Sequence, residues 1–406
     1  MLRALTTFQP GGGGGGKAGE AQHSSLAAPS WWSPSSPSSS TMDLLPDHLP
    51  RYHIECKLVA CEEERFAGAD KTFVRGCLAR ALSRGLHRAG EGSIGDIVLG
   101  YLASESLYVL SLLHSDESES ADHHVHVCRG GAQWEHLVFE QGPVPDARAL
   151  PSPSGDGLYL VGGRLDLGAP TNRFSFMRLR PEAQARRPLR RMCLSRRGCG
   201  VCLCSRSQGG RGRGEKKRRR PLLYVVGGYD EKERPLRCME TYDLEENEWS
   251  LRRESQMPLG GECHAFLSEG GKALICVVCD RDHNIAIQRF EIGTGRWSLV
   301  SQDDVKGVTS VAVVMAKQHL FVIGGYLWHA DRSFERSRDI KIFDLQQRKW
   351  LGPTPATMRT RRLSPSAAYL PSRGVLMVAG GANSYAEDYK EVEIFRIEDL
   401  LGPKLG

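Results

Sequence analysis

The sequence predicts an all-β protein in which six similar four-stranded blades form a ring, preceded by a short helical segment and a disordered N-terminal tail. Three observations lead to this prediction. Short apolar strands ending in paired glycines recur along the chain, and a tryptophan follows several of them at a fixed interval. Glycine, at 45 of 406 residues, is frequent enough to supply many tight turns.

Residues 1–41 are expected to be disordered. They contain six consecutive glycines and a stretch rich in serine and proline around Trp31 and Trp32. Such a composition buries too little apolar surface to offset the entropy of ordering the chain. We therefore interpret this segment as an idle tail, with a short linear motif for a partner at Trp31 and Trp32 as the alternative.

Residues 42–94 are predicted to form an extension made of a helix and a strand. Within residues 72–90, Val74, Leu78, Leu82 and Leu86 are spaced four apart, which is typical of the apolar stripe of an amphipathic helix. This stripe needs a partner surface, on the ring or on another protein. Residues 51–60 are predicted to form a strand.

From about residue 95 to the end, the chain repeats a unit of about fifty residues. An interval of seven residues separates Val127 from Trp134, Tyr242 from Trp249, Phe290 from Trp297 and Phe343 from Trp350. The apolar second strands of the six units are 107–112, 158–163, 223–228, 275–280, 321–325 and 375–381. The interval fits a strand end, a tight hairpin and a return that directs the indole at the neighbouring unit.

The sixth unit ends without its fourth strand, since the chain stops soon after residue 397. An open ring would leave two exposed strand edges, which proteins usually avoid. We expect residues 51–60 to pair with the sixth unit and close the ring.

The double glycine, the Tyr242-Asp243 pair and the spaced tryptophan resemble the kelch repeat. The resemblance covers roughly residues 95–398 and implies a six-bladed kelch β-propeller similar to those of the kelch-like family. Two units depart from the pattern, with Ser111-Leu112 and Cys279-Asp280 in place of paired glycines.

The resemblance also implies a function. Many kelch-like proteins use the propeller to select substrates for cullin-type ubiquitin ligases, although no BTB domain is recognisable before the propeller here. The resemblance therefore favours a non-enzymatic protein-interaction module, with a ligase-adaptor role as one form of it. The alternatives are a kelch-type enzyme acting on carbohydrate and a kelch protein that binds actin or the cytoskeleton.

Residues 181–220 form a basic insert, with 14 Lys and Arg against 2 Asp and Glu in a chain of net charge +6. We expect residues 189–194 and 200–205 to be strands, and residues 206–220 to be a loop between the first and second strands of the third blade. A solvated loop is the favoured interpretation. A nuclear-localisation or nucleic-acid contact and translated non-coding sequence are the alternatives.

The twelve cysteines show no disulfide framework, which favours reduced thiols in the cytoplasm or the nucleus. Cys193, Cys199, Cys202 and Cys204 have a spacing that zinc ligands can show, but we favour structural thiols. Cys276 and Cys279 should point to opposite faces of one strand. His124, His126 and Cys128 share a strand face, for which a polar exposed surface is favoured over a metal site.

No phosphate loop, zinc-protease motif, nucleophile elbow or dinucleotide fingerprint occurs in the chain, and no run is long enough to span a membrane. We therefore predict no catalytic residue, cofactor or metal, and a binding function carried by loops. Loops joining the second and third strands, and loops between blades, should share one face and capture an acidic or polar peptide segment. The residues expected to contact this partner are Tyr326, Trp328, His329, Arg332, Arg336, Arg359, Arg361, Arg362, Tyr385 and Tyr389.

Overall fold

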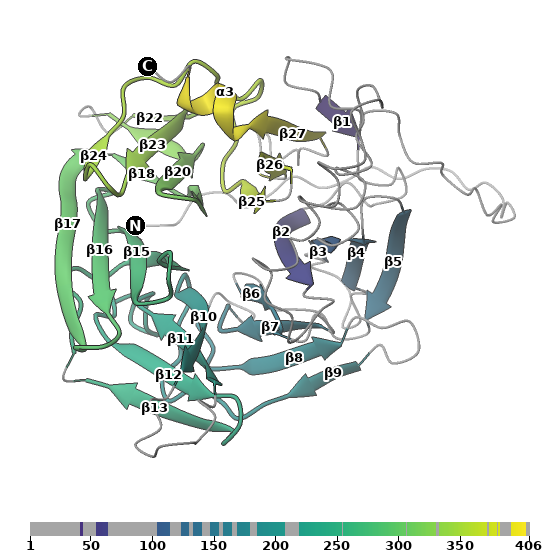
Figure 1. The fold of residues 1–406 in the computed structure, drawn as a ribbon, viewed down its shortest axis with the longest axis vertical. Helices are drawn as coiled ribbons and strands as arrows, with labels where there is room; N and C mark the ends of the chain where they lie inside the picture. Colours follow the sequence, from purple (N-terminus) through teal and green to yellow (C-terminus); the bar gives the residue numbers. More distant parts are fainter. Residues whose placement is uncertain are drawn as a thin grey trace, which may run out of the picture.

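A computed structural model of the chain shows sheets arranged in a ring (Figure 1). It describes residues 41–43, 54–63, 104–113, 123–129, 133–139, 147–153, 157–164, 169–178, 185–207, 219–253, 255–305, 307–329, 333–371, 373–379, 381 and 391–402. The predicted tail, residues 1–41, lies outside these residues except for Thr41, which is ordered as the first residue of a strand, Thr41–Asp43. The predicted helix at 72–90 lies outside them as well.

Six four-stranded antiparallel sheets make up the ring, which confirms the predicted six-bladed propeller. Blade 1 contains β2 (Ile54–Glu63), β3 (Ser104–Leu113), β4 (His123–Arg129) and β5 (Gln133–Phe139). Blade 2 contains β6 (Arg148–Pro151), β7 (Gly157–Val161), β8 (Phe174–Arg178) and β9 (Ala185–Pro188). Blade 3 contains β10 (Gly200–Ser207), β11 (Arg219–Val226), β12 (Met239–Asp243) and β13 (Glu248–Arg252).

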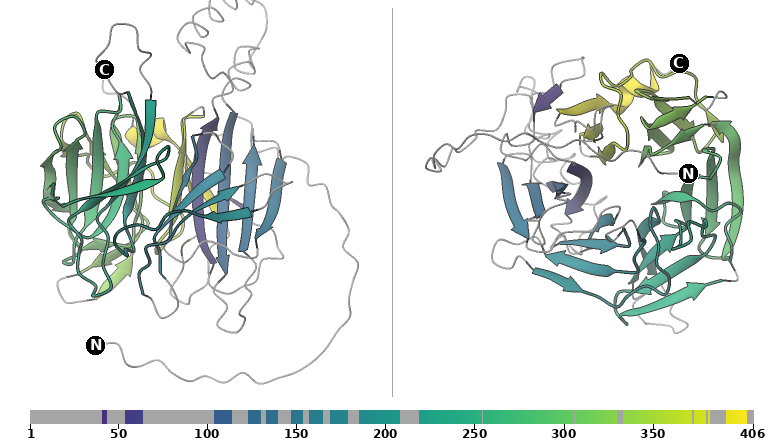
Figure 2. Two further views of the ribbon diagram at one scale, coloured as in Figure 1. Left: turned by 90° about the horizontal axis from the view of Figure 1, so that it is seen from below. Right: turned by 180° about the vertical axis from the view of Figure 1, so that it is seen from behind.

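The remaining blades complete the circle, which Figure 2 shows from the side and from behind. Blade 4 contains β14 (Glu262–Leu267), β15 (Ala273–Cys279), β16 (Ile285–Glu291) and β17 (Arg296–Val305). Blade 5 contains β19 (Ala312–Ala316), β20 (His319–Ile323), β23 (Ile340–Asp344) and β24 (Lys349–Trp350). Blade 6 contains β25 (Ser366–Leu370), β26 (Val375–Ala379), β27 (Glu391–Arg396) and β1 (Thr41–Asp43).

A small additional sheet joins β18 (Val308–Thr309), β21 (Tyr326–Trp328) and β22 (Phe334–Arg336) beside blade 5. The helix α3 (Ile397–Leu401) follows β27 and buries Ile397 and Leu400.

Ring closure uses a different segment from the one the sequence predicts. Residues 54–63 form β2, which pairs with β3 as the first strand of blade 1 and not with the sixth blade. Blade 6 is completed by β1, where Thr41 pairs with Glu393 and Asp43 with Glu391. A strand from the N-terminal side of the first blade does close the ring, as predicted, but it is Thr41–Asp43 and not residues 51–60. The ring therefore includes strands that precede residue 95.

The regular tryptophan spacing has its predicted structural cause in three blades. Tyr242 faces Trp249 across a hairpin, and Phe290–Trp297 and Phe343–Trp350 form the equivalent cross-strand pairs. The indole of Trp249 meets Phe174 of blade 2 at a ring distance of 5.3 Å, so it packs between adjacent blades. In blade 1 Trp134 pairs with Cys128 and not with Val127, so the hairpin there is one residue shorter. The seven-residue interval from Val127 to Trp134 therefore does not mark a cross-strand pair in this blade.

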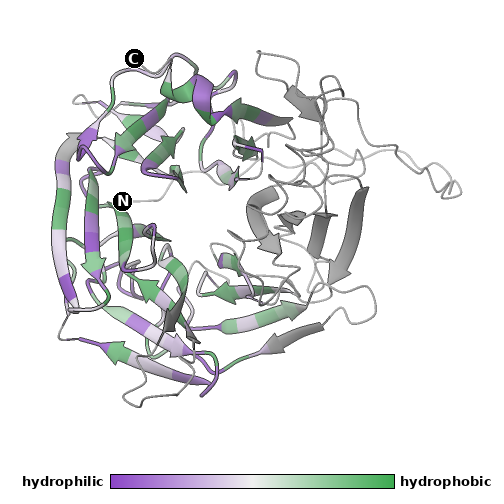
Figure 3. Cartoon of the chain, viewed as in Figure 1, coloured by the Kyte–Doolittle hydropathy of each residue, from purple (hydrophilic) through white to green (hydrophobic). Residues whose placement is uncertain are grey.

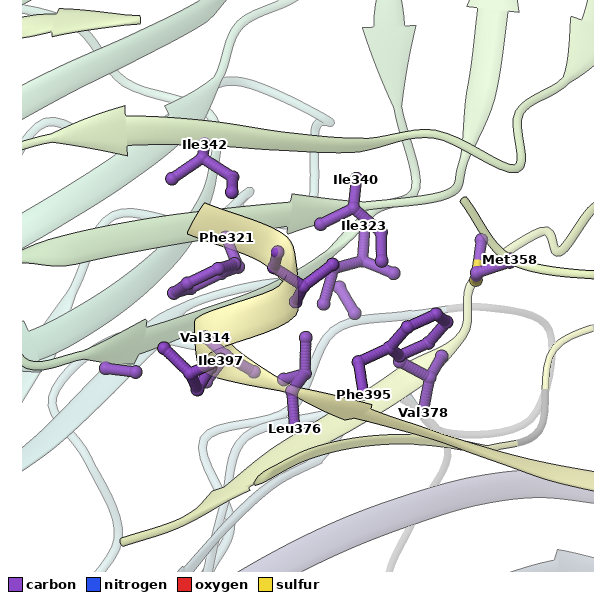
Figure 4. Close-up of a cluster of buried hydrophobic side chains, with 13 residues drawn as sticks. Val314, Phe321, Ile323, Ile340, Ile342, Met358, Leu376, Val378, Phe395 and Ile397 are labelled. Atoms are coloured by element: carbon purple, nitrogen blue, oxygen red, sulfur yellow. The ribbon is translucent and has the colours of Figure 1, made fainter. Parts of the chain in front are cut away.

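Apolar side chains fill the spaces between neighbouring blades. The second strand β15 is buried along its whole length and is uniformly hydrophobic in Figure 3. Between blades 5 and 6, one cluster joins side chains of β19, β20 and β23 to side chains of β25, β26, β27 and α3. Figure 4 shows Phe321 and Ile342 facing Leu376 and Ile397 across this interface.

The loops that connect successive blades are fixed by buried polar side chains. In the loop before blade 3, Arg196 lies 2.7 Å from Glu240 of β12, and both side chains are fully buried. In the loop before blade 6, Arg362 and Glu393 of β27 form the equivalent pair at 3.1 Å, again fully buried. Blade 4 has Gln288 at this position, where it hydrogen-bonds the main chain of Leu259.

Within the basic insert, the loop predicted at residues 206–220 falls between β10 and β11, the first and second strands of blade 3, as expected. Pairing of these strands extends to Ser207 and Arg219, so both ends of the predicted loop are in strands. Residues 208–218 lie outside the described residues. Residues 200–205 are in β10 as predicted, but the fourth strand of blade 2 is Ala185–Pro188 and not 189–194. The predicted strand included the apolar residues Leu189 and Met192. In the structure these two side chains lie in a loop and pack between blades.

The cysteines of blades 3 and 4 are buried among apolar side chains. Cys202, Cys204 and Cys276 belong to one cluster between these blades, and burial raises the pKa of the Cys202 thiol to about 12. Cys279 instead approaches the carbonyl oxygen of Val308 on the side of blade 5, at 3.1 Å. The prediction that Cys276 and Cys279 point to opposite faces is therefore confirmed.

Acid should destabilise the fold through His264 of β14. This side chain is partly buried, its Nε2 is enclosed without a hydrogen-bond partner, and burial together with the charge of Arg148 lowers its pKa well below the usual value. The folded state keeps the imidazole neutral, so its stability is complete above the unfolded-state pKa of about 6.5 and declines as the pH falls below it.

We expect this decline to reach at most about 1.4 kcal/mol by pH 5.5. Urea unfolding at pH 7.5 and 5.5 of the natural chain and of His264→Phe measures it, because phenylalanine keeps the ring but does not titrate. An equal loss of stability in both proteins would assign the acid sensitivity to other groups.

Candidate functional site

Two kinds of loop gather on one face of the ring. In an antiparallel blade, the connection between the second and third strands emerges at the same end as the connection to the next blade. Hydrogen bonds between the two kinds of loop confirm this arrangement. The Val308 amide, between blades 4 and 5, donates to the His283 carbonyl in the β15–β16 loop at 2.7 Å. This is the face on which the sequence places the partner-binding residues.

Blade 5 carries an aromatic hairpin on this face, which we define as β21, β22 and their side chains. Tyr326 and Phe334 meet edge to face with ring centres 4.8 Å apart, and Trp328 lies 5.2 Å from Phe334. Phe334 is 52% exposed, and among the described residues the only other exposed large hydrophobic residue is Leu299. Phe334 is therefore open to solvent, while Tyr326 and Trp328 beside it are half-buried.

Strand alternation places these side chains together. The pairs Tyr326–Arg336 and Trp328–Phe334 lie directly across the hairpin, so all four side chains project from one side of the small sheet. The guanidinium of Arg336 lies 5.9 Å from the Tyr326 ring centre, within reach of a cation–π contact. The opposite side carries Leu327 and Glu335.

Blade 4 supports the hairpin from one flank. His283 stacks on Trp328 with ring centres 4.9 Å apart and planes inclined by only 5°. The loop that presents His283 is held by Asp280, whose carboxylate accepts the amides of Asp282 and Asn284 at 2.9 Å each. The loop that supports Trp328 is therefore held in shape by hydrogen bonds within the loop itself.

The loop before blade 6 supports the other flank. Arg361 donates to the carboxylate of Glu335 at 2.6 Å and to the carbonyl of Arg336 at 3.0 Å. This hydrogen bond and the charge of Arg361 lower the pKa of Glu335, so the carboxylate stays ionised at neutral pH. His329 lies 3.8 Å from the same carboxylate.

The structure brings together five of the predicted partner-binding residues: Tyr326, Trp328, His329, Arg336 and Arg361. Arg359 has an exposed side chain in the loop before blade 6, and its amide donates to Glu393. Arg332, Tyr385 and Tyr389 lie outside the described residues.

Arg362 is a correction to the predicted set. Its side chain is fully buried, and its guanidinium donates to Glu393 through Nε and through Nη2. A residue enclosed in this way cannot reach a partner protein. Arg362 holds the loop between blades 5 and 6 in place while the adjacent Arg361 faces solvent.

Sequence reasoning missed three residues of the site: Phe334, Glu335 and His283. The sequence contained a signal for Phe334 and Glu335. The patterns Tyr326-x-Trp328 and Phe334-x-Arg336 both show strand alternation, which indicates a hairpin within one predicted loop. His283 had none, since its contact with Trp328 depends on how two blades are placed in the ring.

Within the described part of the chain, no group of three His, Cys, Asp or Glu side chains could hold a metal ion. The same residues include no helix that is long and apolar enough to cross a membrane.

Comparisons with known proteins agree with this architecture. The family described as Kelch motif matches residues 220–253, which cover β12, β13 and all but the first residue of β11 in blade 3. No curated protein matches the chain. The chain is similar to 363 chains of solved structures. One of them, titled "Structure of YjhT", has a TM-score of 0.53 and 13% identity, over 72% of this chain and 92% of that one. This identity shows a shared fold only. With six blades of this construction and a matching motif in the third, the chain is a kelch-repeat β-propeller protein.

Proposed function

We propose that the protein is an interaction module that recognises a partner protein through the aromatic hairpin and the arginines beside it. The observation that carries the proposal is the exposure of Phe334 within a cluster of rings held in place by two neighbouring blades. A free apolar surface of this kind is usually covered by a partner.

The composition of the surface is typical of the centre of a protein interface. Aromatic side chains and arginine contribute most of the binding energy in such interfaces, and lysine contributes little. Tyr326, Trp328 and Phe334 are rigid rings, so a partner that covers them costs little side-chain entropy. Their contacts with each other and with His283 fix their orientation before binding.

The charges around the hairpin favour an acidic partner segment. The described residues on the side of blade 6 include the cations Arg336, Arg338, Arg359 and Arg361 and the anions Glu335 and Asp339. The cations outnumber the anions, and guanidinium groups bind carboxylates through paired hydrogen bonds. The preferred partner is therefore a segment with an apolar anchor and nearby acidic residues.

Replacing Phe334 by alanine should weaken partner binding about 30-fold, because a central anchor is worth about 2 kcal/mol or more. The measurement uses the full chain as bait, compares the proteins it captures with those captured by Phe334→Ala, and then determines the dissociation constant for a purified partner.

Leu299→Ala is the matched control. Leu299 is the other exposed large hydrophobic residue among those described, but it lies on β17, the outer strand of blade 4. Partners lost with Phe334→Ala and kept with Leu299→Ala identify the aromatic hairpin as the binding surface. Equal capture by all three proteins would reject the proposal.

An adaptor role in a cullin-type ubiquitin ligase is the more specific form that the kelch resemblance suggests. It requires two separate contacts, one for the substrate and one for the ligase. Capture of a cullin that persists in Phe334→Ala, together with loss of other partners, would support this role. Absence of any cullin from the captured proteins would leave a module that acts outside such ligases.

A further inference from the structure

We infer that the partner binds as an added β-strand along the free edge of β22, and that it presents an apolar residue and an acidic residue two positions apart. This inference rests on the proposed function and specifies how the aromatic hairpin would hold its partner. It follows from the hydrogen-bond pattern of β22 and from the order of its side chains.

The first step concerns the main chain of β22. The His329 amide donates to the Ser333 carbonyl at 2.9 Å, and the Ser337 amide donates to the Gly325 carbonyl at 2.8 Å. In an antiparallel ladder, hydrogen-bonded pairs alternate with pairs whose amides and carbonyls point away from each other. Residues 334 and 336 therefore direct their main-chain groups away from β21.

The second step concerns what lies along this edge. The small sheet has the order β18-β21-β22, so among the described residues no strand continues it beyond β22. Arg361 donates to the Arg336 carbonyl, which confirms that this carbonyl faces outward. Among the described residues, the amide and carbonyl of Phe334 and the amide of Arg336 remain for an incoming strand. An unpaired edge of this kind is a template for strand addition.

The third step concerns the side chains. Phe334 and Arg336 project from the same side of the sheet, together with Trp328 and Tyr326. In an added strand, the residue beside Phe334 would meet these rings and is expected to be apolar. The residue two positions away would lie beside Arg336 and is expected to be acidic. The residue between them would project toward Glu335, whose charge Arg361 already pairs, so an acid there is expected to gain less than an acid beside Arg336.

The proposal is tested with dye-labelled, threonine-rich heptapeptides and the full-length protein. In the first peptide a glutamate precedes a phenylalanine by two residues, the order that places them beside Arg336 and Phe334 in an antiparallel strand. In the second the glutamate is adjacent to the phenylalanine, so that composition is unchanged but the carboxylate lies on the other face. The third is the first peptide with an N-methyl group on the phenylalanine amide, and the fourth carries the methyl group on the next amide along.

We expect the first peptide to bind, measured by fluorescence anisotropy up to about 1 mM, and to bind at least about threefold more tightly than the second. Only one of the two methylated peptides should lose binding, since only alternate amides face the edge of β22. Phe334→Ala should weaken the first peptide, and Leu299→Ala should not.

Three results would overturn the proposal: no peptide binds, the two glutamate positions bind equally, or both methylated peptides bind as well as the first. Loss of captured partners in Phe334→Ala combined with any of these results would leave the proposed function standing and reject strand addition. Normal partner capture by Phe334→Ala would reject both.

Discussion

Replacing Glu240 by alanine is expected to lower the free energy of unfolding by about 3–5 kcal/mol. The Arg196 guanidinium would remain fully buried without the carboxylate that now lies 2.7 Å away. The amides of Cys193 and Leu194 would also lose their acceptor, since both donate to Glu240 at 2.6 and 3.2 Å. Glu240 therefore ties three groups of the loop between blades 2 and 3 to β12.

Urea denaturation followed by tryptophan fluorescence measures the change, with Glu248→Ala as the matched control. Glu248 lies in the next strand of the same blade, and its ion pair with Arg190 is mostly exposed, so its loss should cost at most about 1 kcal/mol. The double variant Arg196→Met, Glu240→Leu should recover much of the lost stability, because it removes both charges. Similar losses of unfolding free energy for Glu240→Ala and Glu248→Ala would show that burial does not make the Arg196–Glu240 pair more stabilising than an exposed one.

Replacing Gly325 by alanine should cost about 3 kcal/mol or more. Gly325 has a φ of +89°, a region that other residues enter at a cost of about 1–2 kcal/mol. A methyl group there would also lie 2.4 Å from the carbonyl oxygen of Thr309 and 2.7 Å from a methyl carbon of Val311. Neither neighbour moves easily, because one is main chain and the other is buried between blades.

Gly295→Ala separates the two contributions to this cost. Gly295 has a φ of +69°, and a methyl group added there meets nothing within 4 Å, so only the backbone term of about 1–2 kcal/mol applies. Thermal unfolding of the two variants under the same conditions gives the comparison. Equal losses would mean that blade 5 relaxes around the added methyl group.

Most of the ring could be predicted from the sequence because the blades repeat the same short-range sequence pattern. The cross-strand pair of Tyr242 and Trp249 and the paired glycines are local features, and they recur with the repeat. The closing strand could not be predicted in the same way. β1 has three residues without apolar alternation, so only its place beside β27 makes it a strand.

The sequence could predict which loops form the site, but it was less able to predict which residues in those loops are exposed. Arg361 and Arg362 are adjacent and chemically identical, yet one is exposed and the other is fully buried. What separates them is Glu393 in β27 of blade 6, which accepts hydrogen bonds from the guanidinium of Arg362. Phe334 was overlooked because its loop was not recognised as a hairpin, although its alternation with Arg336 is visible in the chain.

The pairing of β1 with β27 has a consequence for biosynthesis. During translation, Thr41 leaves the ribosome long before Glu393, its eventual neighbour, has been made. Five blades can assemble in order as they emerge, but the sixth must wait for both ends of the propeller. We therefore expect nascent chains halted before residue 391 to bind chaperones through an incomplete last sheet, and to lose that affinity once β27 is released.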